Sequence, residues 1–184
     1  IDGSTGDFTL NAGSGIITAH PSGLSQLAAT GSVQLTGTRT YSPAADYTYN
    51  GSVVQVTGNG ISTTNDLTFS NANGVTLTNG ITVNGDLNLV SGNITTGANV
   101  LYLANGAAAS LTYGAGNFID GFFERAISAS ATDYYFPVGA TQRQMALFNF
   151  TNLSTGSLRV RYLEADPNGS GLPLFDLDGQ QVAF

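Results

Sequence analysis

Residues 46–49 (DYTY), 66–69 (DLTF) and 86–89 (DLNL) are three copies of one pattern, spaced twenty positions apart. Each copy begins with an acidic residue and then alternates apolar and polar side chains, as a half-buried β-strand does. A second series with the same spacing begins at residues 59 (NGIST), 79 (NGITV) and 99 (NVLYL). A fixed period of about twenty residues built from short strands predicts a parallel β-helix, in which each coil stacks on the next.

A third set of short strands lies between these two series, at residues 54–56, 75–77 and 94–96. Three strands per coil should give three interior ladders of apolar side chains, with neighbours about 4.8 Å apart. The expected ladders are Tyr47, Leu67 and Leu87; Val54, Val75 and Ile94; and Ile61, Ile81 and Leu101. An antiparallel sandwich is the alternative for short strands with frequent turns. The repeated turn chemistry at a fixed period favours the solenoid.

The repeat decays at both ends. Residues 8–10, 16–18 and 33–35 are strand-like, and residues 22–29 are a candidate short helix or cap. The strand expected after residue 104 arrives late, at 111–113, which indicates an enlarged loop at 105–109. Longer strands then follow at 122–127, 134–138, 146–150 and 158–162, the last two flanking a hairpin loop at 152–156. We therefore expect an all-β chain, with a parallel β-solenoid at 1–120 and an antiparallel β module at 121–184 that covers its end.

The composition excludes several classes of function. Only 9% of the residues are charged, the net charge is −7, and there is no cysteine. Binding to nucleic acid requires clustered cations that displace counterions from phosphates, and the five basic residues of this chain are too few and too scattered. No apolar run approaches the roughly 20 residues that span a bilayer, so membrane insertion is not expected. Thiolate metal sites and disulfides are excluded.

Two motifs resemble those of large secreted surface proteins of Bacteroidetes. Residues 87–97 (LNLVSGNITTG) are similar to their LxLxxGxITTG coil, and residues 121–125 (GFFER) and 135–139 (YFPVG) are similar to the β module that follows it. The resemblance covers residues 31–171 and implies export by the type IX secretion route. It also implies that the chain belongs to a secreted protein, such as an adhesin, that lies at the cell surface or in an extracellular fibre.

Several residues are candidates for chemistry. His20, the single histidine, has no evident orienting partner or nucleophile, so a hydrolytic triad is not expected. The carboxylates of Asp46, Asp66 and Asp86 should stack at the strand spacing. We expect them to cap turns, with a Ca²⁺ site or a catalytic carboxylate pair as the alternatives. The side chains of Asn59, Asn79 and Asn99 should form a structural amide ladder.

The C-terminal sequence offers a weak metal site and an assembly segment. Asp166, Asn168, Asp176 and Asp178 have the oxygen ligands of Ca²⁺ loops, although the same residues suit ordinary turns. No other cofactor is expected. The last residues, Gln180, Gln181, Val182, Ala183 and Phe184, form an apolar strand-like stretch that could add to a sheet edge of another copy.

These observations favour a non-enzymatic structural or adhesive protein that assembles head to tail by strand addition. Its expected partners are copies of itself or other surface proteins, and extracellular glycans. The alternative function is a carbohydrate-active β-helix that binds or cleaves polysaccharide. Residues 46–103 contain no Arg, Lys or His, so this part of the solenoid lacks the cations that polyuronate-cleaving β-helices use.

Overall fold

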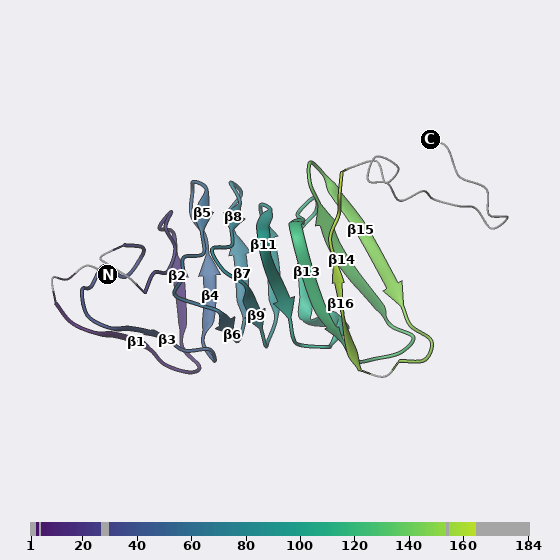
Figure 1. Cartoon of the computed structure of the whole chain (residues 1–184), viewed down its shortest axis with the longest axis horizontal. Coiled ribbons are helices and arrows are strands. Elements are labelled where there is room, and N and C mark those ends of the chain that lie inside the picture. Colours follow the sequence, from purple (N-terminus) through teal and green to yellow (C-terminus); the bar gives the residue numbers. More distant parts are fainter. Residues whose placement is uncertain (1–2, 4, 27–29, 154, 165–184) are drawn as a thin grey trace.

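The computed structural model describes residues 3, 5–26, 30–153 and 155–164 of the chain. The described part is all-β, with a parallel β-solenoid of about four turns and a single 3-10 turn, η1 (Ala108–Ser110). The coils stack along the long axis of the molecule (Figure 1). No helix in the described ranges is long and apolar enough to cross a membrane. The strands are β1 (Phe8–Leu10), β2 (Gly15–Thr18), β3 (Arg39–Tyr41), β4 (Asp46–Tyr49), β5 (Gln55–Val56), β6 (Thr63–Thr64), β7 (Leu67–Ser70), β8 (Val75–Thr76), β9 (Ile81–Val83), β10 (Leu87–Ser91), β11 (Ile94–Leu103), β12 (Leu111–Tyr113), β13 (Ile119–Ile127), β14 (Asp133–Gly139), β15 (Arg143–Asn149) and β16 (Gly156–Val160).

The first wall is a five-stranded parallel sheet in the order β12-β10-β7-β4-β2. Its register confirms the twenty-residue period, because Tyr47 lies opposite Leu67 and Leu67 lies opposite Leu87. A second inward column contains Tyr49, Phe69 and Leu89, in the same three strands. These six side chains are 0–1% exposed. The parallel pairing also excludes the antiparallel sandwich for this part of the chain.

The second wall corrects one expected ladder. Val54 was expected to face inward opposite Val75, but Gln55 occupies that position. Val54 is 62% exposed, whereas Gln55 is completely buried. Gln55 can face inward because its amide is fully hydrogen-bonded to the neighbouring turns. It accepts from Gly51 N (2.7 Å) and donates to the carbonyl oxygens of Thr18 (3.1 Å) and His20 (3.1 Å).

The third wall follows the expected period with one irregularity. Ile81 and Leu101 lie opposite each other and are buried, as predicted. Ile61 is also buried, but the printed register of β6 and β9 places Thr63 opposite Thr82, a spacing of nineteen positions. Ile61 therefore lies in the core without standing directly opposite Ile81.

The N-terminal region only partly follows the prediction. Strands β1 and β2 form where expected, and they pair in parallel with β3 and β4. Residues 33–35 form no strand, although Val33 is completely buried. Residues 22–26 form no helix, because Leu24 makes an isolated bridge to Gly31 and donates its backbone N–H to Thr57 O (3.0 Å). Residues 27–29 of the expected helix lie outside the described part.

The late coil is confirmed. Leu111 stands opposite Leu87, and the extra residues form η1 and the turn before it. The side chain of Ser110 closes this turn, because its single hydroxyl proton is shared between Ala107 O (2.7 Å) and Asn105 O (2.9 Å).

At the C-terminal end, β13 continues the solenoid, because it pairs in parallel with β11. Ile119 lies opposite Ile94 at one end of this pairing, and Arg125 lies opposite Leu103 at the other. Strand β13 is one continuous strand, although its register with β11 shifts between Thr95 and Val100. Two antiparallel pairs follow, β14 with β15 and β13 with β16. The expected hairpin between residues 146–150 and 158–162 is therefore wrong. Strand β15 turns back on β14, whereas β16 returns to the edge of β13.

Candidate interaction surface at the C-terminal end

The acidic ladder is part of the scaffold. The carboxylate of Asp46 accepts a hydrogen bond from Asp66 N (3.1 Å), and the carboxylate of Asp66 accepts one from Asp86 N (2.8 Å). A Cβ at Gly85 would overlap the Asp66 carboxylate, which explains why glycine precedes Asp86. The carboxylates of Asp46 and Asp66 thus cap the turns of the following coils, as the sequence predicts, whereas the Asp86 carboxylate accepts from the side chain of Asn105 (3.5 Å).

Replacing both Asp66 and Asp86 with asparagine should change the free energy of unfolding by less than about 0.5 kcal/mol, because the side-chain oxygen of an asparagine at position 66 can still accept the hydrogen bond from the backbone N–H of residue 86. Asp66→Ala removes the acceptor and should cost about 1 kcal/mol. Chemical denaturation followed by circular dichroism measures both values. If Asp66→Ala is no less stable than the wild type, the capping role is wrong.

The other predicted polar residues also serve the scaffold. Asn79 Nδ2 donates to Ile61 O (2.8 Å) and Asn99 Nδ2 donates to Leu77 O (3.2 Å), so these amides bridge neighbouring coils. Their partners are backbone carbonyls and not one another, which corrects the expected amide ladder. His20 is half-buried in a turn, where its Nδ1 accepts a hydrogen bond from Ser22 N (3.1 Å).

The candidate calcium ligands and the assembly segment fall outside the described residues. This applies to Asp166, Asn168, Asp176 and Asp178, and to residues 180–184. Within the described ranges, no group of three Asp, Glu or His side chains could hold a metal ion. No enclosed pocket is present in the same part of the chain.

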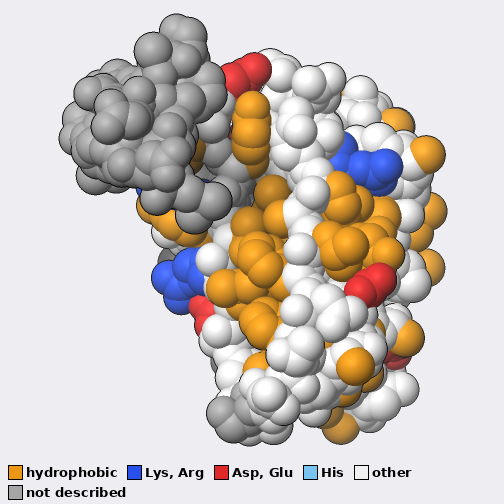
Figure 2. Space-filling view, turned by 90° about the vertical axis from the view of Figure 1, so that its right-hand side faces the viewer, with side chains coloured by type: hydrophobic (Ala, Val, Ile, Leu, Met, Phe, Trp, Pro, Cys, Tyr) orange, Lys and Arg blue, Asp and Glu red, His pale blue; other side chains and the backbone are white. Residues whose placement is uncertain are grey.

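The described residues instead form an apolar surface where the solenoid ends. Strand β15 pairs antiparallel with β14, and β16 pairs antiparallel with β13. Strand β14 also joins β13 in parallel, at Ile119 and Val138. Apolar side chains of β15, β16 and the residues that follow each strand pack against the core but remain half-exposed. Figure 2 shows hydrophobic side chains gathered at this end of the molecule. We call this surface the C-terminal apolar face; it comprises Phe148, Phe150, Leu153, Leu158, Val160 and Tyr162.

Aromatic packing connects this face to the solenoid core. Phe136 of β14 is completely buried and contacts Phe123 of β13 at a centroid distance of 5.6 Å. Phe148 packs edge-on against Phe136 at 5.5 Å and stacks with Phe150 at 6.4 Å. The apolar face is therefore the outermost layer of the core, and no described strand covers it.

A buried arginine anchors β14. Arg125 is 1% exposed, and its guanidinium donates to the carbonyl oxygens of Tyr135 (3.0 Å), Ala107 (3.2 Å) and Ala108 (3.1 Å). The guanidinium carbon also lies 5.1 Å from the ring centre of Tyr134. Desolvation lowers the pKa of Arg125 from its ordinary value. Arg125 thus joins β14 to the enlarged loop. The sequence did not predict this contact, because arginine side chains are rarely fully buried.

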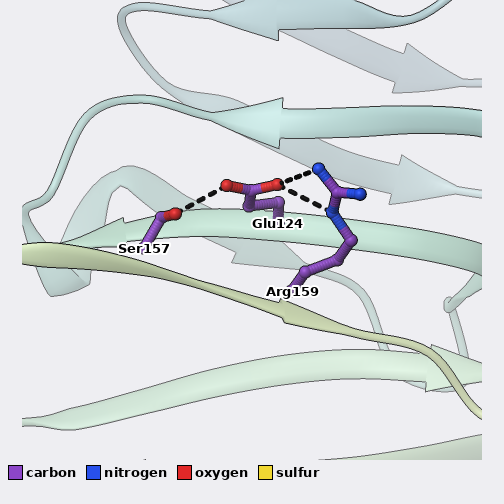
Figure 3. A network of polar contacts seen from close by, with 3 residues as sticks. All are labelled: Glu124, Ser157 and Arg159. Atoms are coloured by element: carbon purple, nitrogen blue, oxygen red, sulfur yellow. Dashed lines mark hydrogen bonds and ion pairs between the residues drawn. The ribbon is translucent and has the colours of Figure 1, made fainter.

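The outer side of β13 and β16 is polar. Glu124 accepts hydrogen bonds from Ser157 Oγ (2.6 Å) and Arg159 Nε (2.8 Å), and Arg159 Nη2 lies 2.7 Å from the same carboxylate (Figure 3). The hydrogen bond from Ser157 is the main cause of the lowered pKa of Glu124. Arg161 lies over the ring of Phe122, at 4.8 Å from its centre. Strand β16 therefore has one apolar face and one cationic face.

Comparison with known proteins found no relative of this chain. No family model, no curated protein and no solved structure matches the chain.

Proposed function

We propose that this chain is a non-enzymatic structural or adhesive module of an extracellular surface protein. In this proposal the solenoid is a rigid scaffold, and the C-terminal antiparallel strands are the cap that ends it. The observation that carries the proposal is that the buried and stacked polar side chains bind the backbone of the scaffold itself. The groups that could have done chemistry, namely the Asp66 carboxylate, the Gln55 amide and the Arg125 guanidinium, are bound to backbone groups of neighbouring turns.

The sheet edges support assembly by strand addition. Strand β2 ends its sheet, and it pairs only with β4 among the strands that the structure describes. Ile17, in the middle of β2, is 68% exposed. An exposed edge with an apolar side chain readily pairs with another strand. We propose that residues 180–184 of one copy add to this edge of the next copy, which would build a head-to-tail filament.

Sedimentation velocity and negative-stain imaging test the assembly. The intact chain should form long polymers at micromolar concentration, whereas the chain without residues 180–184 should sediment as a monomer. Ile17→Lys should also prevent polymers, because an edge lysine opposes strand pairing. Thr48→Lys places the same charge on the outer face of a central strand, β4, and should leave assembly intact. A monodisperse monomer for the intact chain at high concentration would overturn this part of the proposal.

A further inference from the structure

Strand β16 has an unpaired edge that is chemically asymmetric. Among the described residues, β16 pairs only with β13. Leu158, Val160 and Tyr162 are half-buried on the apolar face, whereas Arg159 and Arg161 are exposed on the opposite side. An added strand would therefore need apolar residues on one face and acidic residues on the other.

The backbone of β16 also has a defined orientation at this edge. Phe122 N donates to Thr96 Oγ1 (2.8 Å), which lies on the β11 side of β13. The backbone N–H and C=O groups of successive strand residues point to opposite sides, so those of Phe123 point toward β16. The backbone groups of its partner, Val160, point back toward β13. The backbone N–H and C=O groups of Arg159 and Arg161 are then the ones directed at the unpaired edge.

The sequence that follows matches these requirements. Asn168-Gly169 is the strongest short signal for a two-residue hairpin turn. A hairpin centred on it pairs apolar with apolar residues, Val160 with Leu177 and Tyr162 with Phe175. The same alignment pairs basic with acidic residues, Arg161 with Asp176 and Arg159 with Asp178.

We propose that residues 172–179 of the same chain add to the unpaired edge of β16 as an antiparallel strand and cover the C-terminal apolar face. The turn at Asn168-Gly169 connects the two strands. The edge of β16 is thus a strand-binding site whose occupant belongs to the same chain. A short connection favours the occupant in the same copy over one from a second copy, because its effective concentration is high.

The register is specific. A shift of one residue in either direction would place an aspartate opposite Val160, on the apolar side of the sheet. Pro173 falls opposite Glu164, an even-numbered position like Val160, so its missing N–H points away from β16 and costs no ladder bond. Exposed Leu163 gains an apolar partner in Leu174. Asp176 and Asp178, which the sequence also offered as calcium ligands, acquire arginine partners instead.

Paired cysteines test the register directly, because the chain has no cysteine of its own. Val160 and Leu177 would form a non-hydrogen-bonded pair, with Cα atoms about 4.5 Å apart, within the range that a disulfide bridges. Dilute Val160→Cys/Leu177→Cys protein should oxidise to an intramolecular disulfide, seen on a non-reducing gel and by mass spectrometry. The control, Val160→Cys/Asp176→Cys, directs the second thiol to the other face and should cross-link at least tenfold more slowly. Equal rates, no disulfide, or a disulfide-linked dimer would each overturn the proposal.

Hydrogen exchange of the unmodified chain gives an independent test. The amides of Arg159 and Arg161 should be protected in the full chain, and unprotected amides at these positions would overturn the pairing. A chain ending at Glu164 should lose at least tenfold protection at Arg159 and Arg161 while Leu158 and Val160, which point toward β13, keep theirs. Removing residues 180–184 alone should change neither the disulfide nor the exchange result. Failure of filament assembly and failure of this strand pairing are therefore distinguishable.

Discussion

Leu87→Ala is expected to lower the free energy of unfolding by about 2–5 kcal/mol, the range for a buried leucine truncated in a well-packed core. Leu87 is completely buried and lies between Leu67 in the coil before it and Leu111 in the coil after it. The cavity would therefore interrupt a continuous column, and neighbouring coils cannot collapse into it without breaking their ladder of hydrogen bonds.

Val54→Ala is the control, because Val54 is an apolar residue of the same solenoid but is 62% exposed. Its free energy of unfolding should change by less than about 0.5 kcal/mol. Urea denaturation monitored by circular dichroism measures both variants. Similar losses in the two variants would contradict the assignment of inner and outer faces.

Gln55→Leu is expected to destabilise the fold by at least about 3 kcal/mol, although it places an apolar residue in the core. The side chain of Gln55 satisfies the backbone N–H of Gly51, the carbonyl oxygens of Thr18 and His20, and the amide of Asn71 (2.9 Å). Each buried polar group left without a partner costs about 1–3 kcal/mol.

Gln55→Glu separates the loss of hydrogen bonds from the change of shape. A protonated glutamic acid still accepts from Gly51 and donates one hydrogen bond, so this variant should be more stable than Gln55→Leu at acidic pH. Burial opposes the ionised form and raises the pKa of the introduced carboxyl group, so its stability should fall as the pH rises. Thermal unfolding of the two variants between pH 4 and about pH 8 checks this order. A Gln55→Leu variant as stable as the wild type would show that the interior amide is dispensable.

The period of the sequence predicted the solenoid because stacking imposes one geometry on every coil. Tyr47, Leu67 and Leu87 recur at the same place because each must fill the same part of the interior. At the second wall, the apolar character of a residue did not predict which side chain faces inward, because the polar Gln55 is buried and its apolar neighbour Val54 is exposed. Only the hydrogen-bond partners supplied by distant turns make Gln55 the better interior residue, and those partners lie in other coils.

The C-terminal end was harder to predict for the same reason. Its strands are recognisable one by one, but β15 and β16 could pair with each other or with earlier strands. The choice depends on Phe136 and Phe148, which pack together, and on β13, whose open edge receives β16. Nor does the sequence around Arg125 indicate that its charge is buried against the carbonyl oxygens of η1 and the residue before it.

Stacking of coils also determines how the molecule would respond to tension. The backbone hydrogen bonds between coils lie along the solenoid axis, so a pull on the two ends loads them one coil at a time. Leu67 and Leu87 occupy adjacent coils about 4.8 Å apart. The twenty residues between them extend to roughly 65–70 Å once a coil is peeled away. With no cysteine to form a cross-link, every detached coil releases its full length. A chain built in this way lengthens in steps under load before the whole fold is lost.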